Sequence, residues 1–99
     1  MPLPFDEDTQ MKIDSLCREY GVGKLWLFGS YARGEQTDES DFDFVYLMNR
    51  KEYGWEIYVF ADELEEVLGR KVDIVPYLYM KPPFKARVEK EMVSVYEAA

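Results

Sequence analysis

Short apolar runs alternate with amphipathic segments along this chain of 99 residues, and this alternation constrains the fold more than any other feature. From Glu7 to Tyr20, apolar residues recur at the i, i+3, i+4 and i+7 spacing of an α-helix, and Gly21 follows. A second helical stripe runs from Tyr53 to Leu68 and ends at Gly69. A third helix is predicted from Phe84 to Glu91, after two prolines that suit a helix start.

Three runs between these helices have the composition of β-strands. They are Leu25–Phe28, Asp41–Met48 and Val72–Val75. The final residues, MVSVYEAA, either extend the third helix or form an edge strand. We therefore expect an α/β (α+β) fold with a small mixed sheet. A chain of this length forms one domain, residues 1–99, and leaves little room for a second one around a large substrate.

The charge and composition exclude several classes of function. Twelve basic and twenty acidic residues give a net charge of −8, which repels nucleic-acid backbones, so no direct nucleic-acid binding is expected. No apolar run approaches the roughly 18 residues of a membrane span, and the N-terminus lacks a leader pattern, so we expect a soluble, cytoplasmic protein. Because the chain has no histidine, His-based catalysis and His-ligated zinc are excluded. The single cysteine, Cys17, is interpreted as core filling.

Two acids interrupt the apolar run of the second predicted strand. Asp41 and Asp43 are two residues apart, so on a strand their carboxylates project from the same face and repel each other. A divalent cation between them relieves that repulsion, and oxygen-only ligands favour Mg²⁺ or Mn²⁺. A third acid, Asp73, lies in the strand KVDIV and joins the pair if the two strands are neighbours.

A glycine turn precedes this acidic pair by about a dozen residues. Gly29 and Ser30 follow a predicted strand and lead into a segment that fits one helical turn and contains Arg33. Backbone N–H groups and a hydroxyl at such a turn suit a phosphate, and Arg33 adds a positive charge. A triphosphate held there and by metal ions on the acids is the arrangement for phosphoryl transfer.

Each of these features also has a simpler interpretation. Gly29-Ser30 by itself is most simply a turn, and the acids by themselves fit the wet face of an edge strand. Arg33 by itself fits a surface ion pair with Glu35 or Asp38. The combination at this spacing is more specific than any of its parts.

The stretch GSYARGEQTDESDFDFVY, with VDIV after the intervening helix, resembles the minimal nucleotidyltransferases of the DNA polymerase beta-like superfamily. The resemblance covers essentially the whole chain. It implies a mixed sheet with helices packed on one face, and ATP with Mg²⁺ at Gly29, Ser30, Asp41 and Asp43. It further implies Asp73 as a third metal ligand that orients the attacking hydroxyl. Tyr31 stands where many relatives have arginine, which is a departure from the pattern.

Members of this family commonly act as antitoxins beside a helical HEPN-domain toxin and transfer AMP to one of its tyrosine hydroxyls. The resemblance therefore implies a protein adenylyltransferase in a hetero-oligomer. Two alternatives stay open. One is an antitoxin that acts by occlusion alone, and the other is a transferase acting on a small molecule such as an aminoglycoside.

An aromatic content of 16% also predicts a protein interface. Trp55 and Tyr58 fall outside the core-facing stripe of the second helix, and the loop around Tyr79 adds apolar surface just after Asp73. Aromatic residues and methionine with few charges are typical of the centre of an interface. The alternative is that these side chains fill a small core.

Overall fold

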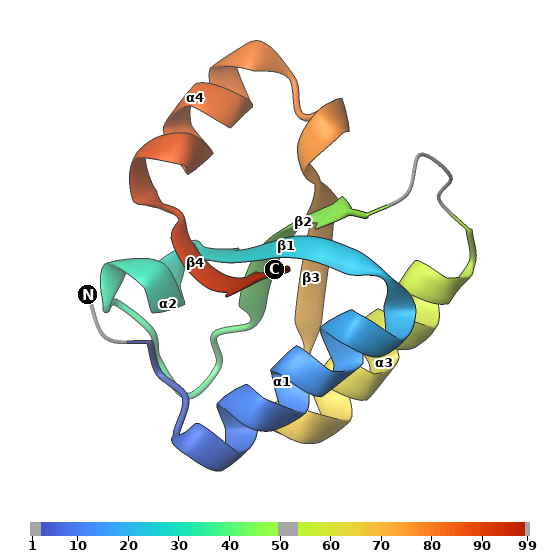
Figure 1. The fold of residues 1–99 in the computed structure, drawn as a ribbon. Helices are drawn as coiled ribbons and strands as arrows, with labels where there is room; N and C mark the ends of the chain where they lie inside the picture. Colours follow the sequence, from blue (N-terminus) through green and yellow to red (C-terminus); the bar gives the residue numbers. More distant parts are fainter. Residues whose placement is uncertain (1–2, 50–53, 99) are drawn as a thin grey trace.

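A computed structural model describes residues 3–49 and 54–98, and in it helices and strands alternate along the chain (Figure 1). The helices are α1 (Glu7–Tyr20), α2 (Ser30–Arg33), α3 (Glu56–Leu68) and α4 (Pro82–Glu91), with a 3₁₀ turn η1 (Tyr77–Tyr79) before α4. The strands are β1 (Val22–Phe28), β2 (Phe42–Met48), β3 (Val72–Pro76) and β4 (Val93–Glu97). Within the described ranges, no helix is long and apolar enough to cross a membrane.

The four strands form one mixed sheet in the order β3-β2-β1-β4. β1 pairs antiparallel with both β2 and β4, whereas β2 and β3 run parallel. A parallel pair needs a crossover connection, which the α3 segment supplies. The mixed α/β architecture confirms the predicted fold class.

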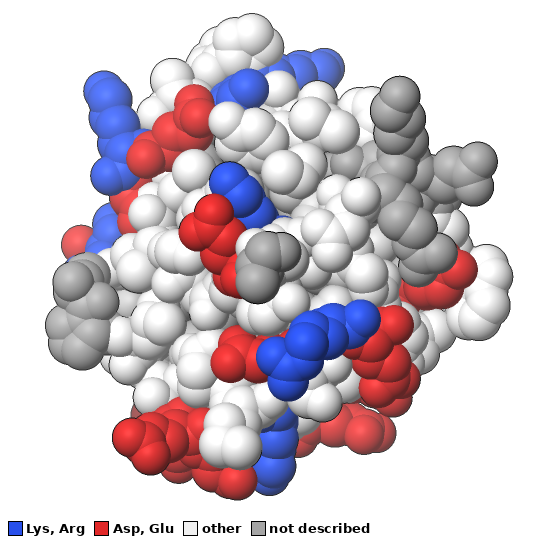
Figure 2. All heavy atoms as spheres, in the orientation of Figure 1, with Lys and Arg blue, Asp and Glu red and all other residues white. Residues whose placement is uncertain are grey.

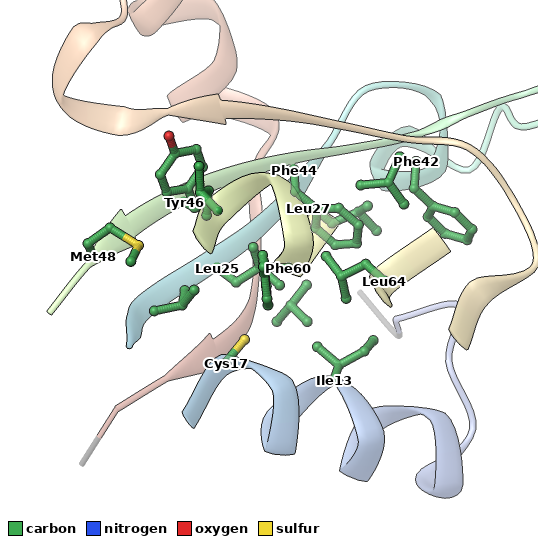
Figure 3. Packing of buried hydrophobic residues seen from close by; sticks show 14 of the residues in the cluster. Ile13, Cys17, Leu25, Leu27, Phe42, Phe44, Tyr46, Met48, Phe60 and Leu64 are labelled. Carbon is green, nitrogen blue, oxygen red and sulfur yellow. The ribbon is translucent and has the colours of Figure 1, made fainter. Parts of the chain in front are cut away.

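α1 and α3 cover one face of the sheet and enclose the main core, as the resemblance implies for the helices, whereas the third predicted helix, α4, lies over the opposite face (Figure 1). Figure 3 shows Ile13 and Cys17 of α1 beside Phe60 and Leu64 of α3, with Phe44 of β2 among them. All five side chains are fully buried. Removing such apolar surface from water is the main force that stabilises a small domain.

A smaller cluster lies on the opposite face, which η1 and α4 partly cover. Phe28 of β1 and Val45 of β2 pack there with Met80 and with Val88 of α4. The rings of Phe28 and Phe84 meet edge to face, with centroids 6.1 Å apart. α4 therefore adds a second helical layer, and it lies on the side of the sheet where the acidic residues project.

The predicted boundaries hold best where a cap is present. α1 spans the predicted residues because the Asp6 side chain accepts a hydrogen bond from the Thr9 N–H at 2.7 Å and Gly21 ends the helix with φ 74°. β1 begins at Val22, three residues before the predicted start, and α4 begins at Pro82. The C-terminal segment forms the edge strand β4, which decides between the two predicted alternatives. The predicted helix start at Tyr53 lies outside the described residues.

Cys17 is core filling, as predicted. Its side chain is fully buried in the cluster between α1 and the sheet. Burial, with a smaller contribution from the nearby charge of Asp14, raises the pKa of the Cys17 thiol to about 12. A thiol in that environment is not a nucleophile near neutral pH.

Candidate active site

Asp43 and Asp73 are direct partners across the parallel ladder between β2 and β3. Side chains at paired positions of neighbouring strands project from the same face of the sheet. Two residues beyond Asp43, Val45 packs in the cluster beneath α4, so both acids project on the α4 side. Asp41 lies immediately before β2, two residues from Asp43. The sheet therefore brings together the three acids that the sequence pattern singled out.

The turn at Gly29 lies against this acidic group. Phe28, the last residue of β1, pairs with Asp43, so Gly29 follows directly beside that carboxylate. Its backbone has φ 77° and ψ −156°, a region that is essentially restricted to glycine. A Cβ atom placed on Gly29 would collide with the Asp43 side chain. Glycine is thus required at position 29 for two reasons: the backbone conformation, and the close approach of this backbone to the Asp43 side chain.

The acids act on one another electrostatically. The pKa of Asp43 is raised above its ordinary value, first by burial and then by repulsion from Asp73 and Asp41. Arg33 opposes this shift, and Glu91 adds to it. A carboxyl group in such a site gains from any cation that reduces the repulsion.

The donor set has the chemistry of a Mg²⁺ or Mn²⁺ site, because it consists of carboxylate oxygens without histidine or cysteine. In the present side-chain positions, no group of three His, Cys, Asp or Glu residues within 3–49 and 54–98 is close enough to hold a metal ion. The ladder register places Asp43 opposite Asp73, and Asp41 is two residues from Asp43 in sequence.

Ser30 and Arg33 begin and end the single turn of α2. Arg33 is exposed, and its guanidinium is paired twice. Nε donates to Glu35 at 3.0 Å, and Nη1 donates to both carboxylate oxygens of Glu91 at 3.2 and 3.1 Å. The pairing of Arg33 with Glu35 considered from the sequence is therefore present, and a second partner, Glu91, joins it.

Glu91 is a site residue that the sequence pattern did not reveal. It is the last residue of α4, and its side chain is 21% exposed. Its Oε1 accepts hydrogen bonds from the Gly29 N–H at 3.1 Å and from Arg33, and its Oε2 accepts the second one from Arg33. Glu91 is 62 residues from Gly29 in sequence, so no local motif signals this contact.

A pocket of about 320 Å³ opens beside the glycine turn. Its lining residues come from β1, the turn, α2 and α4: Phe28, Gly29, Arg33, Phe84, Arg87, Val88 and Glu91. Figure 2 shows acidic side chains concentrated over α1 and α3, whereas Lys and Arg are prominent around α4. The charged residues that line the pocket are two arginines, Arg33 and Arg87, and one acid, Glu91.

The aromatic residues predicted to dock a partner are on the surface. Trp55 and Tyr58 are each 72% exposed, and Tyr79 is 70% exposed. Leu78, beside Tyr79 in η1, is 61% exposed. These side chains do not fill the core, whereas Met80 of the same loop is 9% exposed and packs with Phe28 and Val45, so the interface interpretation holds for only part of the loop. Because η1 directly follows β3, Tyr79 lies on the segment that leads away from Asp73.

Comparison with known proteins identifies what the chain is similar to. The family model described as a nucleotidyltransferase domain matches residues 10–95. A protein of Methanocaldococcus jannaschii, provisionally named a protein adenylyltransferase, is 35% identical over 88 residues, which are 89% of this chain and 95% of that protein.

Two solved structures have a similar fold. One, described provisionally as a minimal nucleotidyltransferase, has a TM-score of 0.77 and 29% identity and covers 94% of this chain and 95% of its own. The other is a chain from the complex of a tri-AMPylated Shewanella oneidensis HEPN toxin with its MNT antitoxin. It has a TM-score of 0.68 and 20% identity, covers 93% of this chain and 72% of its own, and is evidence for the fold alone.

Proposed function

Because this chain belongs to the nucleotidyltransferase domain family, we propose that it transfers AMP from ATP to a tyrosine hydroxyl of a HEPN-type toxin and thereby neutralises that toxin. The M. jannaschii relative named for protein adenylyltransfer supports the activity. The kind of partner is what the resemblance to minimal nucleotidyltransferases implies, and the fold shared with an antitoxin chain agrees with it. In this proposal the whole chain, residues 1–99, is one catalytic domain that acts in the cytoplasm.

The observation that carries the proposal is the pairing of Asp43 with Asp73 beside the Gly29 turn. Carboxylates on adjacent strands bind the cations that accompany a triphosphate, and a turn without a side chain lets a phosphate approach the backbone. We assign nucleotide binding to Gly29, Ser30 and Arg33. We assign metal binding to the three acids described above.

Mg²⁺ bound by Asp41, Asp43 and Asp73 would neutralise the charge of the phosphates and of the leaving pyrophosphate. The acceptor oxygen forms a bond to the α-phosphorus, and the bond from that phosphorus to the bridging oxygen of the β-phosphate breaks. Asp73 is exposed at the edge strand of the sheet, where an incoming hydroxyl can reach it. It orients that hydroxyl and accepts its proton as the new bond forms.

The acceptor reaches the site as part of a folded partner. Its exposed aromatic side chains lie on the segment that follows Asp73 and at the start of α3. We assign Trp55, Tyr58 and Tyr79 to the docking surface, which makes the active form a hetero-oligomer.

Pyrophosphate release tests this function. The purified chain, Mg·ATP and a cognate HEPN-type toxin should release pyrophosphate, and omission of either the toxin or Mg²⁺ should stop the release. Asp41→Asn should abolish release, whereas Asp62→Asn, an exposed position on α3, should leave it unchanged. Neutralisation of the toxin without pyrophosphate release would instead establish an antitoxin that acts by occlusion.

A further inference from the structure

Glu91 occupies the donors to which the proposed function assigns a phosphate. The Gly29 N–H and the Arg33 guanidinium converge on its carboxylate, with all three donor–acceptor distances between 3.1 and 3.2 Å. A carboxylate and a phosphate use such donors in the same way, because both are anions with oxygens that accept charge-assisted hydrogen bonds.

The surroundings show that this contact is more than a surface ion pair. The Glu91 side chain is about half as exposed as that of Arg33, at 21% against 44%. Glu91 also lines the pocket that opens between the glycine turn and α4. The negative charge of Glu91 also repels the carboxylate of Asp43 and helps to raise its pKa. An acid is an unfavourable neighbour for three other acids unless it has donors of its own.

From this arrangement we infer that Glu91 is an internal competitor for the triphosphate: it binds the phosphate donors in the nucleotide-free chain and must leave them when ATP binds. The inference rests on the proposed function, since it concerns the nucleotide site of that reaction. Glu91 is thus a residue that sets nucleotide affinity, and it is not a ligand of the nucleotide or its metal.

Release of Glu91 does not require the fold to open. Glu91 ends α4, and two residues later Val93 begins β4, where it pairs with Leu27 of β1. The backbone is therefore fixed on both sides, and only rotation of the side chain is needed. If Glu91 holds the donors for nine tenths of the time, the apparent Kd for the nucleotide is about tenfold weaker than the intrinsic value.

The sign of the effect separates competition from the role of a metal ligand and from that of a residue that positions Arg33. A metal ligand or a residue that positions Arg33 would weaken nucleotide binding when it is replaced. A competitor would strengthen it. Glu91→Gln keeps the size of the side chain and removes its charge, and Glu89→Gln is the matched control. Glu89 lies on the same helix and accepts a hydrogen bond from the Tyr77 hydroxyl at 2.8 Å, away from Gly29 and Arg33.

The experiment is a calorimetric titration of each full-length variant with Mg·ATP at about 0.15 M salt, where charges farther apart than about 8 Å are screened. Glu91→Gln should bind roughly three- to tenfold more tightly than the wild type, and Glu89→Gln should stay within about twofold. A thermal melt of each variant verifies that it is folded. Unchanged or weaker binding by folded Glu91→Gln overturns the inference.

A parallel titration with Mg·tripolyphosphate separates this inference from the proposed function. If Glu91→Gln binds tripolyphosphate more tightly while no chain transfers AMP, the competitor role stands and adenylyl transfer falls. If the wild type transfers AMP but Glu91→Gln gains no affinity for either ligand, adenylyl transfer stands and the competitor role falls. If neither anion binds the wild type or Glu91→Gln, both proposals are wrong.

Discussion

Asp43 and Asp73 are direct partners across the β2–β3 ladder, and burial, followed by the repulsion from Asp73, raises the pKa of Asp43. Asp43→Asn should therefore raise the melting temperature of the free chain at neutral pH by a small amount, on the order of 2 °C. In the same variant, Mg·ATP should no longer raise the melting temperature. Thermal melts with and without Mg·ATP measure both effects. If Mg·ATP raises the melting temperature of the variant as much as that of the wild type, Asp43 is not part of the nucleotide site.

The stability gained by Asp43→Asn should depend on pH in one direction. Because the pKa of Asp43 is raised in the folded state, the folded chain holds this proton more tightly than the unfolded chain does. Binding of that proton therefore contributes to the free energy of unfolding at low pH. This contribution is lost as the pH rises above the ordinary pKa of an aspartate, about 3.9. The advantage of the variant should therefore be largest near neutral pH and disappear below about pH 4. Denaturant unfolding across this range gives the free-energy difference, and an advantage that grew toward low pH would contradict it.

Asp73→Asn should separate catalysis from nucleotide binding. If Asp73 mainly orients the acceptor hydroxyl, transfer should fall by roughly 10²-fold or more. The Kd for Mg·ATP should change by less than about threefold, because the phosphates are held by other groups. Single-turnover transfer and calorimetry on the same preparation measure the two quantities. If the transfer rate and the affinity for Mg·ATP fall equally, Asp73 is an ordinary metal ligand or a structural residue.

Gly29→Ala should destabilise the chain and block the site together. The backbone conformation at Gly29 costs a residue with a side chain about 1–3 kcal/mol, and the added Cβ meets the Asp43 carboxylate. We expect a lower free energy of unfolding in denaturant and no measurable Mg·ATP binding by the folded fraction. Gly69→Ala is the control, because its φ is also positive, at 67°, but a Cβ there meets no atom within 4 Å. It should lose stability and keep nucleotide binding.

Trp55→Ala or Tyr79→Ala should weaken partner binding by roughly 1–3 kcal/mol, the range of interface hot spots. The melting temperature of the isolated chain should change little, since both side chains are about 70% exposed. Met11→Ala is a control at a similarly exposed position, 68%, on α1. Calorimetry against the HEPN protein provides the affinities. Normal binding by the two aromatic variants would exclude this surface from docking.

The sequence predicted those parts of the fold that depend on neighbouring residues. The apolar spacing and Gly21 predict α1, and the structure adds Asp6 as its N-cap. Asp41 and Asp43 are recognised from their two-residue spacing. β1 extends further than predicted because Gly23 and Lys24 interrupt its apolar pattern, while the register shift between Val22 and Lys24 lets the strand accommodate them.

The parts that were missed depend on long-range packing. The position of α4 over the second face of the sheet follows from contacts between Phe28, Val45 and Val88, which no local pattern encodes. Glu91 is one of two acids on a helix rich in charges, and only the fold places it on Gly29. An acid whose role depends on a partner 62 residues away cannot be distinguished from a solvated one by its sequence context.

The most direct test of adenylyl transfer is the intact mass of the HEPN partner after incubation with this chain and Mg·ATP. The account predicts a mass increase by whole AMP units on tyrosine, with one pyrophosphate released for each unit. It also predicts an unmodified partner when Asp41→Asn replaces the wild type. A toxin that is bound and inactive yet unchanged in mass, or one modified equally by Asp41→Asn, would contradict the account.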